Sequence, residues 1–134
     1  MGNEHITMIG AGLAGPVMAS YLAELGYSIE IHEKRHDMRL VEQSAGRSIN
    51  LALSKRGINA LKDIGVFEKI KPMMMPMVGR MIHESDGNLH LQKYGQKSSE
   101  VIYSISRAFL NKTLMDHAET KGEVDITFSH PVEK

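Results

Sequence analysis

The sequence predicts an α/β fold that begins with a strand–helix–strand unit and later takes in an antiparallel sheet. Three observations near the start of the chain carry this prediction. An apolar run at residues 6–9 leads into a glycine-rich turn, apolar residues then recur at helical spacing up to Leu25, and a second alternating run at residues 28–33 follows Gly26. Two strands joined through a helix form a right-handed parallel unit. We therefore predict the opening unit of a Rossmann-like nucleotide-binding fold.

The glycine-rich turn, ITMIGAGLAG at residues 6–15, predicts a site for an adenine dinucleotide. Gly10 would allow the tight bend, Gly12 would let a phosphate approach the backbone, and Gly15 would let the helix pack against the strand. The unpaired N–H groups that open this helix favour an anion. Glu33, at the end of the second strand, would accept a hydrogen bond from a ribose hydroxyl and disfavour a 2′-phosphate. An ordinary tight turn is the alternative, and the flanking strand, helix and acid argue against it.

The composition is that of one domain with a small-molecule partner. The 134 residues are 42% hydrophobic, which suffices for a core. Lys and Arg together number 16, as do Asp and Glu, so no net charge draws the chain to nucleic acid or to an anionic membrane. The absence of cysteine excludes a disulfide framework and a thiolate metal site. With no targeting signal expected at the start and no apolar run long enough to span a membrane, we expect a cytoplasmic protein.

The segment after Glu33 is polar, and it predicts a long loop over residues 34–46 near the nucleotide. Lys34 and Arg35 are placed to contact phosphate or ribose. A solvated run of charges is an equally good interpretation of each of these cations, and of Arg39.

The rest of the chain alternates helices and strands. The predicted elements are a strand at 47–53, a helix at 55–64 capped by Ser54 and closed by Gly65, a short helix at 66–70, strands at 78–83, 89–94 and 101–106, a helix at 107–121 capped by Ser106, and a strand at 124–128. The three consecutive strands predict an inserted antiparallel sheet. The methionine-rich segment 72–77 is expected to fill the core or line a pocket, because no cluster of histidines at metal-binding spacing accompanies it.

Three further side chains are candidates for binding an anion or a substrate. Arg80 lies between Val78 and Ile82 in a predicted strand whose two faces both look covered, so its guanidinium needs an anion, and a carboxylate suits its planar fork. A structural salt bridge is the alternative. Tyr94 could offer its phenol to the same pocket or simply pack. Arg107 opens a helix directly after a strand, where backbone N–H groups favour an anion, and is a second candidate phosphate contact.

Four further segments are longer and more specific than the glycine turn. They are GRSINLALSKRG at 46–57, PMVGRMIHESDGNL at 76–89, QKYG at 92–95 and YSISRAFLNKTLMDHAE at 103–119. Together with the glycine turn and Glu33 they resemble the FAD-dependent aromatic hydroxylases, and within that family the members that act on L-kynurenine. The resemblance covers essentially the whole chain but corresponds only to the N-terminal part of such an enzyme. We therefore expect an N-terminal fragment with an incomplete fold.

The resemblance implies FAD as the cofactor, NADPH as a transient co-substrate, O₂ as the oxidant, and 3-hydroxykynurenine as the product. It also implies that Arg80 and Tyr94 hold the amino-acid carboxylate of L-kynurenine, the anion expected for Arg80. The flavin does the chemistry in this family, so no residue of the chain is expected to act as an acid or nucleophile. The FAD contacts implied by position are Gly10, Gly12, Leu13, Ala14, Gly15, Glu33, Lys34, Arg35, Ala52 and Arg107.

The same resemblance implies a division of the chain into two parts. Residues 1–70 and 101–134 would form the nucleotide-binding part, and residues 71–100 would begin the substrate-binding sheet. The family's second flavin motif, an Asp-Gly segment, has no counterpart before Lys134. Two alternatives stay open: another FAD-dependent aromatic hydroxylase, or a non-catalytic remnant that binds FAD or another nucleotide.

Overall fold

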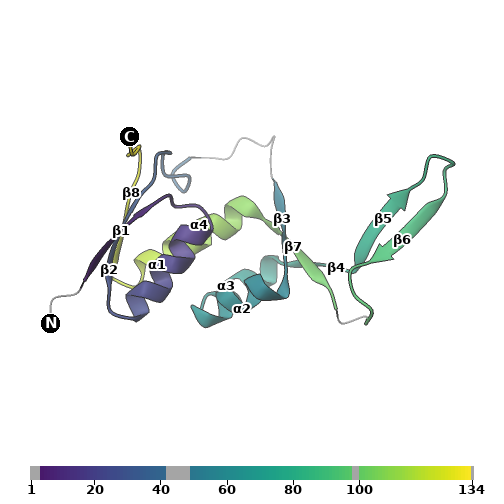
Figure 1. Cartoon of the computed structure of the whole chain (residues 1–134), viewed down its shortest axis with the longest axis horizontal. Helices are drawn as coiled ribbons and strands as arrows, with labels where there is room; N and C mark the ends of the chain where they lie inside the picture. Colours follow the sequence, from purple (N-terminus) through teal and green to yellow (C-terminus); the bar gives the residue numbers. More distant parts are fainter. Residues whose placement is uncertain (1–3, 42–48, 98–99, 134) are drawn as a thin grey trace.

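One end of the molecule is a parallel sheet covered on one face by two helices. The computed structural model describes residues 4–41, 49–97 and 100–133. The strands of this sheet, in spatial order, are β1 (His5–Ile9), β2 (Ser28–His32) and β8 (Val124–Thr127). Helices α1 (Ala14–Glu24) and α4 (Arg107–Glu119) pack against each other on the sheet (Figure 1). The parallel pairing of β1 with β2 around α1 confirms the predicted opening unit.

The covered face of this sheet is apolar because side chains alternate along each strand. Ile29 and Ile31 of β2 and Val124 of β8 are buried there against Ala19 of α1 and Met115 of α4. Burial of each large aliphatic side chain contributes roughly 1.5–3 kcal/mol. This packing fixes the carboxyl ends of β1 and β2 beside each other, which is where the glycine turn and Glu33 lie.

A second, antiparallel sheet lies on the far side of the two helices. Its strands, in spatial order, are β3 (Asn50–Leu53), β7 (Ile102–Ser106) and β4 (Met75–Met77). Three short helices accompany it: α2 (Lys55–Asp63), α3 (Phe67–Ile70) and the 3₁₀ helix η1 (Lys71–Met73). Ile105 of β7 is buried in a second core with Leu61 of α2 and Leu110 and Leu114 of α4. Because α4 contributes to both cores, it joins the two sheets.

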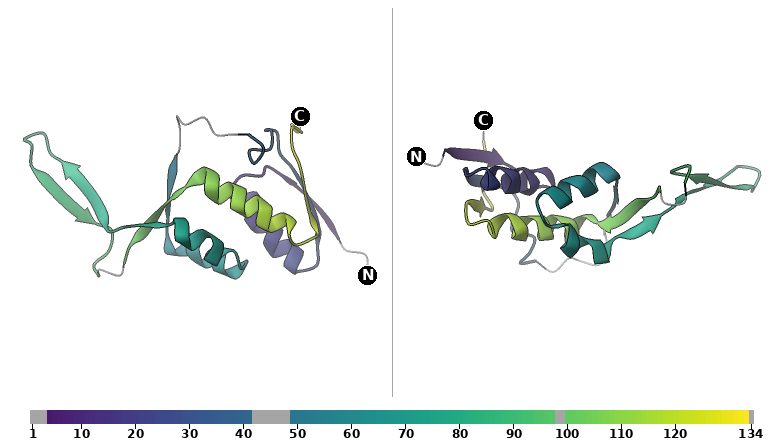
Figure 2. Two further views of the ribbon diagram at one scale, coloured as in Figure 1. Left: turned by 180° about the vertical axis from the view of Figure 1, so that it is seen from behind. Right: turned by 90° about the horizontal axis from the view of Figure 1, so that it is seen from below.

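A β-hairpin projects from the second sheet as a separate unit. Strands β5 (Gly79–His83) and β6 (Leu89–Lys93) pair only with each other, and the hairpin extends away from the helices in both views of Figure 2. Every residue of β6 is exposed. An isolated two-stranded hairpin is marginally stable in water, so this unit depends on its junction with β4 and β7.

The predicted grouping of strands 78–83, 89–94 and 101–106 into one antiparallel sheet is wrong. β5 and β6 do pair, but β7 pairs with β3 and β4. The register sets Ile105 opposite Leu51, and both side chains belong to the second core. The exposed strand β6 has no buried side chain to offer, so burial decides which strand becomes the partner of β7.

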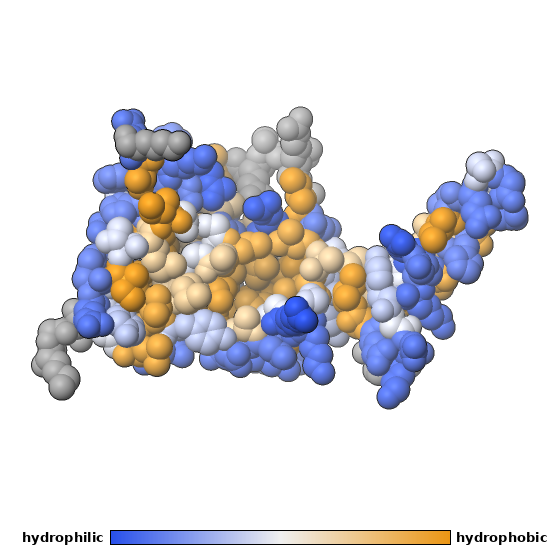
Figure 3. Space-filling view, viewed as in Figure 1, coloured by the Kyte–Doolittle hydropathy of each residue, from blue (hydrophilic) through white to orange (hydrophobic). Residues whose placement is uncertain are grey.

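The expectation that the methionines of residues 72–77 fill the core or line a pocket is only partly correct. Met74 packs against the second core, whereas Met73 and Met75 are 55% and 68% exposed. Apolar side chains also gather on the surface of the helical layer, in the middle of the face seen in Figure 3.

Helix ends follow the sequence more closely than sheet pairing does. Gly26, Gly65 and Gly122 follow α1, α2 and α4 with φ of +90°, +76° and +77°, a backbone region that favours glycine. Ser106 caps α4 by accepting a hydrogen bond from the backbone N–H of Phe109. Residues 47 and 48 of the predicted strand 47–53 lie outside the described residues. No helix among the described residues has both the length and the apolar character needed to cross a bilayer.

Candidate functional site

The glycine turn between β1 and α1 has the backbone geometry expected of a phosphate-binding loop. Gly10 has φ of +97°, and its N–H donates to the carbonyl of His32 at 2.8 Å. A methyl group at Gly15, in the first turn of α1, would collide with the carbonyl oxygen of Gly10, so this position requires glycine. Apart from Gly12 and its two chain neighbours, no described atom lies within 4 Å of the position that a methyl group on Gly12 would take. The backbone at Gly12 is therefore open to a ligand.

The peptide groups of Ala11 are held on both sides by buried side chains. Its N–H donates to Glu33 Oε2 at 2.8 Å, and its carbonyl accepts from Asn111 Nδ2 at 3.1 Å. Glu33 lies just after β2 and Asn111 lies in α4, so the turn is fixed by two elements far apart in sequence. This arrangement limits the freedom of the backbone that leads into Gly12.

Glu33 already accepts four hydrogen bonds. Its Oε1 accepts from the backbone N–H and Nε of Arg35, at 2.9 and 2.8 Å, and its Oε2 accepts from Arg35 Nη2 and Ala11 N–H. The side-chain hydrogen bonds of Arg35 are the largest cause that lowers the pKa of Glu33 to about 2, against the opposing effect of burial. A carboxylate has about four acceptor positions. A ribose hydroxyl that bonds to Glu33 must therefore replace a donor, and the more than half-exposed Arg35 side chain is the one that can move.

Arg39 fastens the loop after β2 to α4. Its guanidinium is hydrogen-bonded to Asp37 at 2.8 Å, to Asp116 at 2.9 Å and to Glu119, and it lies over the ring of Phe128. These carboxylates raise the pKa of Arg39, and Arg39 in turn lowers the pKa of Asp37. The interpretation of Arg39 as a solvated charge is therefore wrong. Arg39 is a structural cation whose bonds hold the loop in position.

Two cavities meet at the glycine turn. One has a volume of about 290 Å³, and its walls include Gly12, Arg35, Arg107 and Asn111. The other has a volume of about 350 Å³, and its walls include Gly10, Gly12, Glu33, Lys34, Arg35 and residues 130–132. Because Gly12 and Arg35 line both, the cavities adjoin each other at the glycine turn, with cations in the walls of each.

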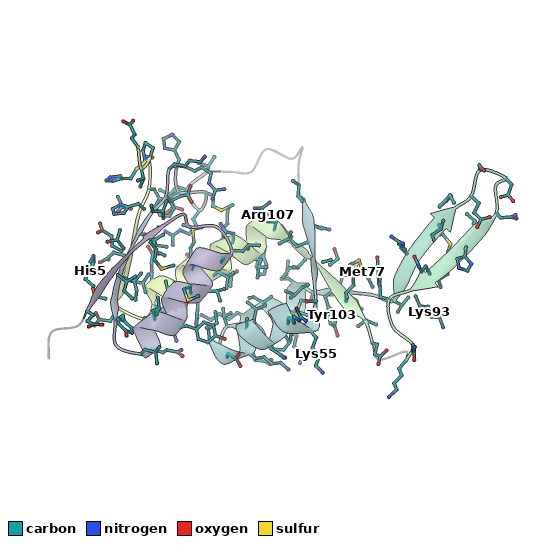
Figure 4. All side chains as sticks on the ribbon, viewed as in Figure 1. His5, Lys55, Met77, Lys93, Tyr103 and Arg107 are labelled. Atoms are coloured by element: carbon teal, nitrogen blue, oxygen red, sulfur yellow. The ribbon has the colours of Figure 1, made fainter. Side chains whose placement is uncertain are left out.

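Arg107 lies at the junction of β7 and α4, as Figure 4 shows. Its side chain is exposed and lines the first cavity. The helix terminus itself is less available to an anion than expected, because Arg107 N–H donates to the carbonyl of Ile49 and Phe109 N–H is bonded to Ser106. What this position offers a phosphate is the guanidinium.

The structure thus brings together Gly10, Gly12, Glu33, Lys34, Arg35 and Arg107 around the two cavities. Leu13, Ala14 and Gly15 belong to the first turn of α1 or the residue before it. Ala52 is exposed on β3 opposite Ser104, and it lines neither cavity. The binding roles assigned to these residues from the sequence stay predictions.

Arg80 and Tyr94 lie on the hairpin, away from the glycine turn. The pairing of Arg80 with Gln92, and the bond from Tyr94 N–H to the carbonyl of Val78, put Arg80 and Tyr94 on the same face of the hairpin. The expectation that both faces of this strand are covered is wrong for the described chain. Arg80 is exposed, and its Nε donates to Gln92 Oε1 at 2.6 Å. The apolar neighbours that suggested burial, among them the exposed Val78, lie on a projecting hairpin with nothing described packed over them.

Sequence reasoning missed two parts of the site. Asn111 is buried in the interior of α4, and residues 130–132 line the second cavity beside Glu33. One signal for Asn111 was available: an amide on the face of a helix that otherwise carries Leu110, Leu114 and Met115. Residues 130–132 carry no comparable pattern, because their position depends on where β8 joins the sheet.

Comparison with known proteins identifies relatives over the whole described chain. A family model for the FAD binding domain matches residues 4–134. The chain is 45% identical over 126 residues to a kynurenine 3-monooxygenase of Legionella pneumophila (strain Corby), which covers 94% of this chain and 28% of that protein. It is 48% identical over 129 residues to a kynurenine 3-monooxygenase of Cytophaga hutchinsonii, covering 95% and 28%. The chain therefore spans 28% of the length of these two curated relatives.

Solved structures share the fold at lower identity. The p-nitrophenol 4-monooxygenase of Pseudomonas putida superposes with a TM-score of 0.77 at 16% identity, over 98% of this chain and 34% of that one. A 2-methyl-3-hydroxypyridine-5-carboxylic acid oxygenase superposes with a TM-score of 0.77 at 18% identity, over 96% and 32%. At these identities the likeness concerns the fold alone, and it confirms the predicted α/β class.

Proposed function

The chain belongs to the FAD binding domain family, and from that premise we propose that it forms the FAD-binding portion of a monooxygenase that hydroxylates L-kynurenine to 3-hydroxykynurenine. The reaction consumes NADPH and O₂, with one oxygen atom entering the aromatic ring and the other leaving as water. The observation that carries the substrate assignment is the identity of 45% and 48%, over nearly the whole chain, with relatives named kynurenine 3-monooxygenase.

The residues of the glycine turn fit the ADP half of FAD. The open backbone at Gly12, between Arg35 and Arg107, suits a pyrophosphate, because two cations and an uncapped helix N-terminus favour negative charge. Glu33 lies in the adjoining cavity, where it suits a ribose. The carboxylate also disfavours a 2′-phosphate, so the NADPH of the proposed reaction would not use this turn.

Bound FAD would supply the redox chemistry, accepting electrons from NADPH and activating O₂. The residues of this chain bind and orient. Arg39 and Asn111 hold the loop and the turn that surround the cofactor. No side chain of this chain is required as a nucleophile, since the flavin carries the reactive step.

The substrate contact proposed for this chain is the pair Arg80 and Tyr94. They share a face of the β5–β6 hairpin, where a guanidinium and a phenol could both reach one carboxylate. Residues 71–100 would accordingly begin the substrate-binding part, and residues 1–70 and 101–134 would form the nucleotide-binding part.

Two measurements on the purified protein test the proposal. The first is the amount of FAD bound per chain, and the second is oxidation of NADPH with and without L-kynurenine, with 3-hydroxykynurenine detected as product. Stoichiometric FAD and kynurenine-stimulated oxidation are the expected results for the complete enzyme of which this chain is the proposed portion. The same activity in the 134-residue chain alone would contradict its assignment as an N-terminal fragment. FAD binding with stimulation by a different aromatic substrate would replace the substrate assignment, and FAD binding without any oxidation would favour a non-catalytic binding module.

A further inference from the structure

We propose that Asn111 is a positioning residue of the dinucleotide site: it fixes the glycine turn through the carbonyl of Ala11, and its Oδ1 accepts a hydrogen bond from a hydroxyl of the bound dinucleotide. The inference rests on the FAD site proposed above and adds a residue to it. Asn111 lies in α4, 100 residues after the peptide that it holds.

The first observation is the bond itself. Asn111 is 5% exposed, and its Nδ2 donates to the carbonyl of Ala11 at 3.1 Å and to Met38 Sδ at 3.2 Å. Asparagine is a weaker helix former than its apolar neighbours, and its buried amide must be desolvated. The bond to Ala11 offsets that cost and places the amide directly behind the turn.

The second observation is the orphaned oxygen of the same amide. Asn111 Oδ1 is buried and has no hydrogen-bond partner among the described residues, although the side chain lines the cavity that contains Gly12, Arg35 and Arg107. An unsatisfied buried acceptor costs about 1–3 kcal/mol. The amide cannot turn over to relieve it, because the oxygen would then face the carbonyl oxygen of Ala11.

These two facts define the chemistry of the missing partner. The proposed partner is a donor that reaches the cavity lined by two arginines, where a phosphate is expected. A dinucleotide carries such donors on either side of its pyrophosphate, as the hydroxyls of the ribose and of the ribityl chain. A hydroxyl donor would complete the hydrogen bonding of Asn111.

Binding measurements with two variants test the proposal. Asn111→Leu keeps a similar volume and loses both polar atoms, while Asn111→Asp keeps an acceptor oxygen and loses the donor to Ala11. Thr113→Ala, in the same helix but outside both cavities, is the matched control. We expect the Kd for FAD to rise at least tenfold in both variants and to stay unchanged in the control.

Titration with ADP separates the two sources of the hydroxyl. Loss of the bond to Ala11 weakens ADP and FAD alike, so an equal loss for both ligands assigns the hydroxyl to the ribose, and a larger loss for FAD than for ADP assigns it to the ribityl chain. A lowered Tm with an unchanged Kd for the folded protein would show that Asn111 serves only the core, and would overturn the proposal.

The unmodified protein supplies a test that does not depend on a variant folding. The side-chain amide protons of Asn111 should exchange slowly and should shift in the NMR spectrum when FAD is added. FAD binding that leaves these signals unmoved would overturn the inference while leaving the proposed function intact. Absence of FAD binding to the unmodified protein would instead overturn the site on which both rest.

Discussion

The glycine turn and the β5–β6 hairpin both carry predicted binding residues, but the two regions hold them in opposite ways. At the turn, Ala11 is bonded on both sides and Glu33 accepts four hydrogen bonds. On the hairpin, Arg80 is exposed, and its only described hydrogen-bond acceptor is Gln92, from the partner strand. The turn is thus organised by residues from three elements, whereas the hairpin is organised by its own register.

This difference shows which of the two regions is preorganised for binding. Where the groups of a site are fixed before the ligand binds, ordering them on binding costs less free energy. The nucleotide site has this property through Glu33, Arg39 and Asn111. The hairpin offers two side chains on one face, and both are exposed.

The largest expected effect is that of one methyl group added to the glycine turn, compared with one added to the hairpin. Gly15→Ala would bring a methyl group against the carbonyl oxygen of Gly10, and Gly79→Ala would bring one against the backbone of Gln92. Overpacking of this kind costs about 1–3 kcal/mol. We expect Gly15→Ala to lower the free energy of unfolding and to weaken FAD binding about a hundredfold, measured by urea denaturation and flavin titration.

Gly79→Ala is the internal control for that comparison. It should disturb the pairing of β5 with β6 and leave the Kd for FAD unchanged, because the hairpin does not reach the glycine turn. An equal loss of FAD binding in both variants would contradict the view that the glycine turn binds FAD and the hairpin does not.

The second prediction concerns the stability that Glu33 gives the turn. Its pKa is lowered from 4.5 to about 2 on folding, so the unfolded chain binds the proton more readily. The ionised Glu33 therefore contributes to the free energy of unfolding above pH 4.5, and this contribution is lost as the pH falls through about 2. Its upper limit is about 3 kcal/mol. We expect Glu33→Gln to flatten this part of the profile of unfolding free energy against pH. Asp125→Asn, at an exposed acid on β8, should leave it unchanged; a profile unaltered by Glu33→Gln would contradict the assignment.

The third prediction tests the hairpin directly. In the active holoenzyme, Arg80→Ala should raise the KM for L-kynurenine at least tenfold, because a charge-assisted bond to the carboxylate is lost. The Kd for FAD should not change. Lys93→Ala removes a cation from the opposite face of the same hairpin and should leave KM unaltered. An unaltered KM in Arg80→Ala would refute the carboxylate assignment.

The smallest expected effect lies at His117, a buried residue of α4. Burial lowers the pKa of His117, although its Nε2 bonds to the carbonyl of Ile64 at 2.7 Å. The folded protein therefore binds this proton less readily than the unfolded chain, whose value is near 6.5, and stability falls as the pH drops below that value. Denaturation between pH 7 and pH 5 should show this loss, and His117→Gln should reduce it. A decline of equal size in both proteins would assign it to other groups.

Local chemistry explains why much of the turn could be predicted. The bend at Gly10, the close approach at Gly15 and the left-handed end of α1 at Gly26 each depend on a few neighbouring residues. Glu33 was found because its distance from the turn is fixed by one helix and one strand.

Long-range burial explains why the rest could not. The pairing of β7 with β3 follows from the shared core of Ile105 and Leu51, which no strand pattern reveals. Asn111 and residues 130–132 reach the site only because α4 and β8 return to the first two strands. The burial expected for Arg80 failed for the same reason, since apolar neighbours on a strand do not say what lies over them.

The position of β8 has a consequence for how the protein folds. β8 begins at Val124 and pairs with β2, which ends at His32, so the intervening chain must be arranged before the parallel sheet can close. Contacts between such distant segments form slowly, because loop closure is unfavourable. Residues 130–132 follow β8 directly and line the cavity beside Glu33. The step that closes the sheet therefore also completes the pocket. If FAD binds only the closed form, its binding shifts the equilibrium of this step toward the closed sheet.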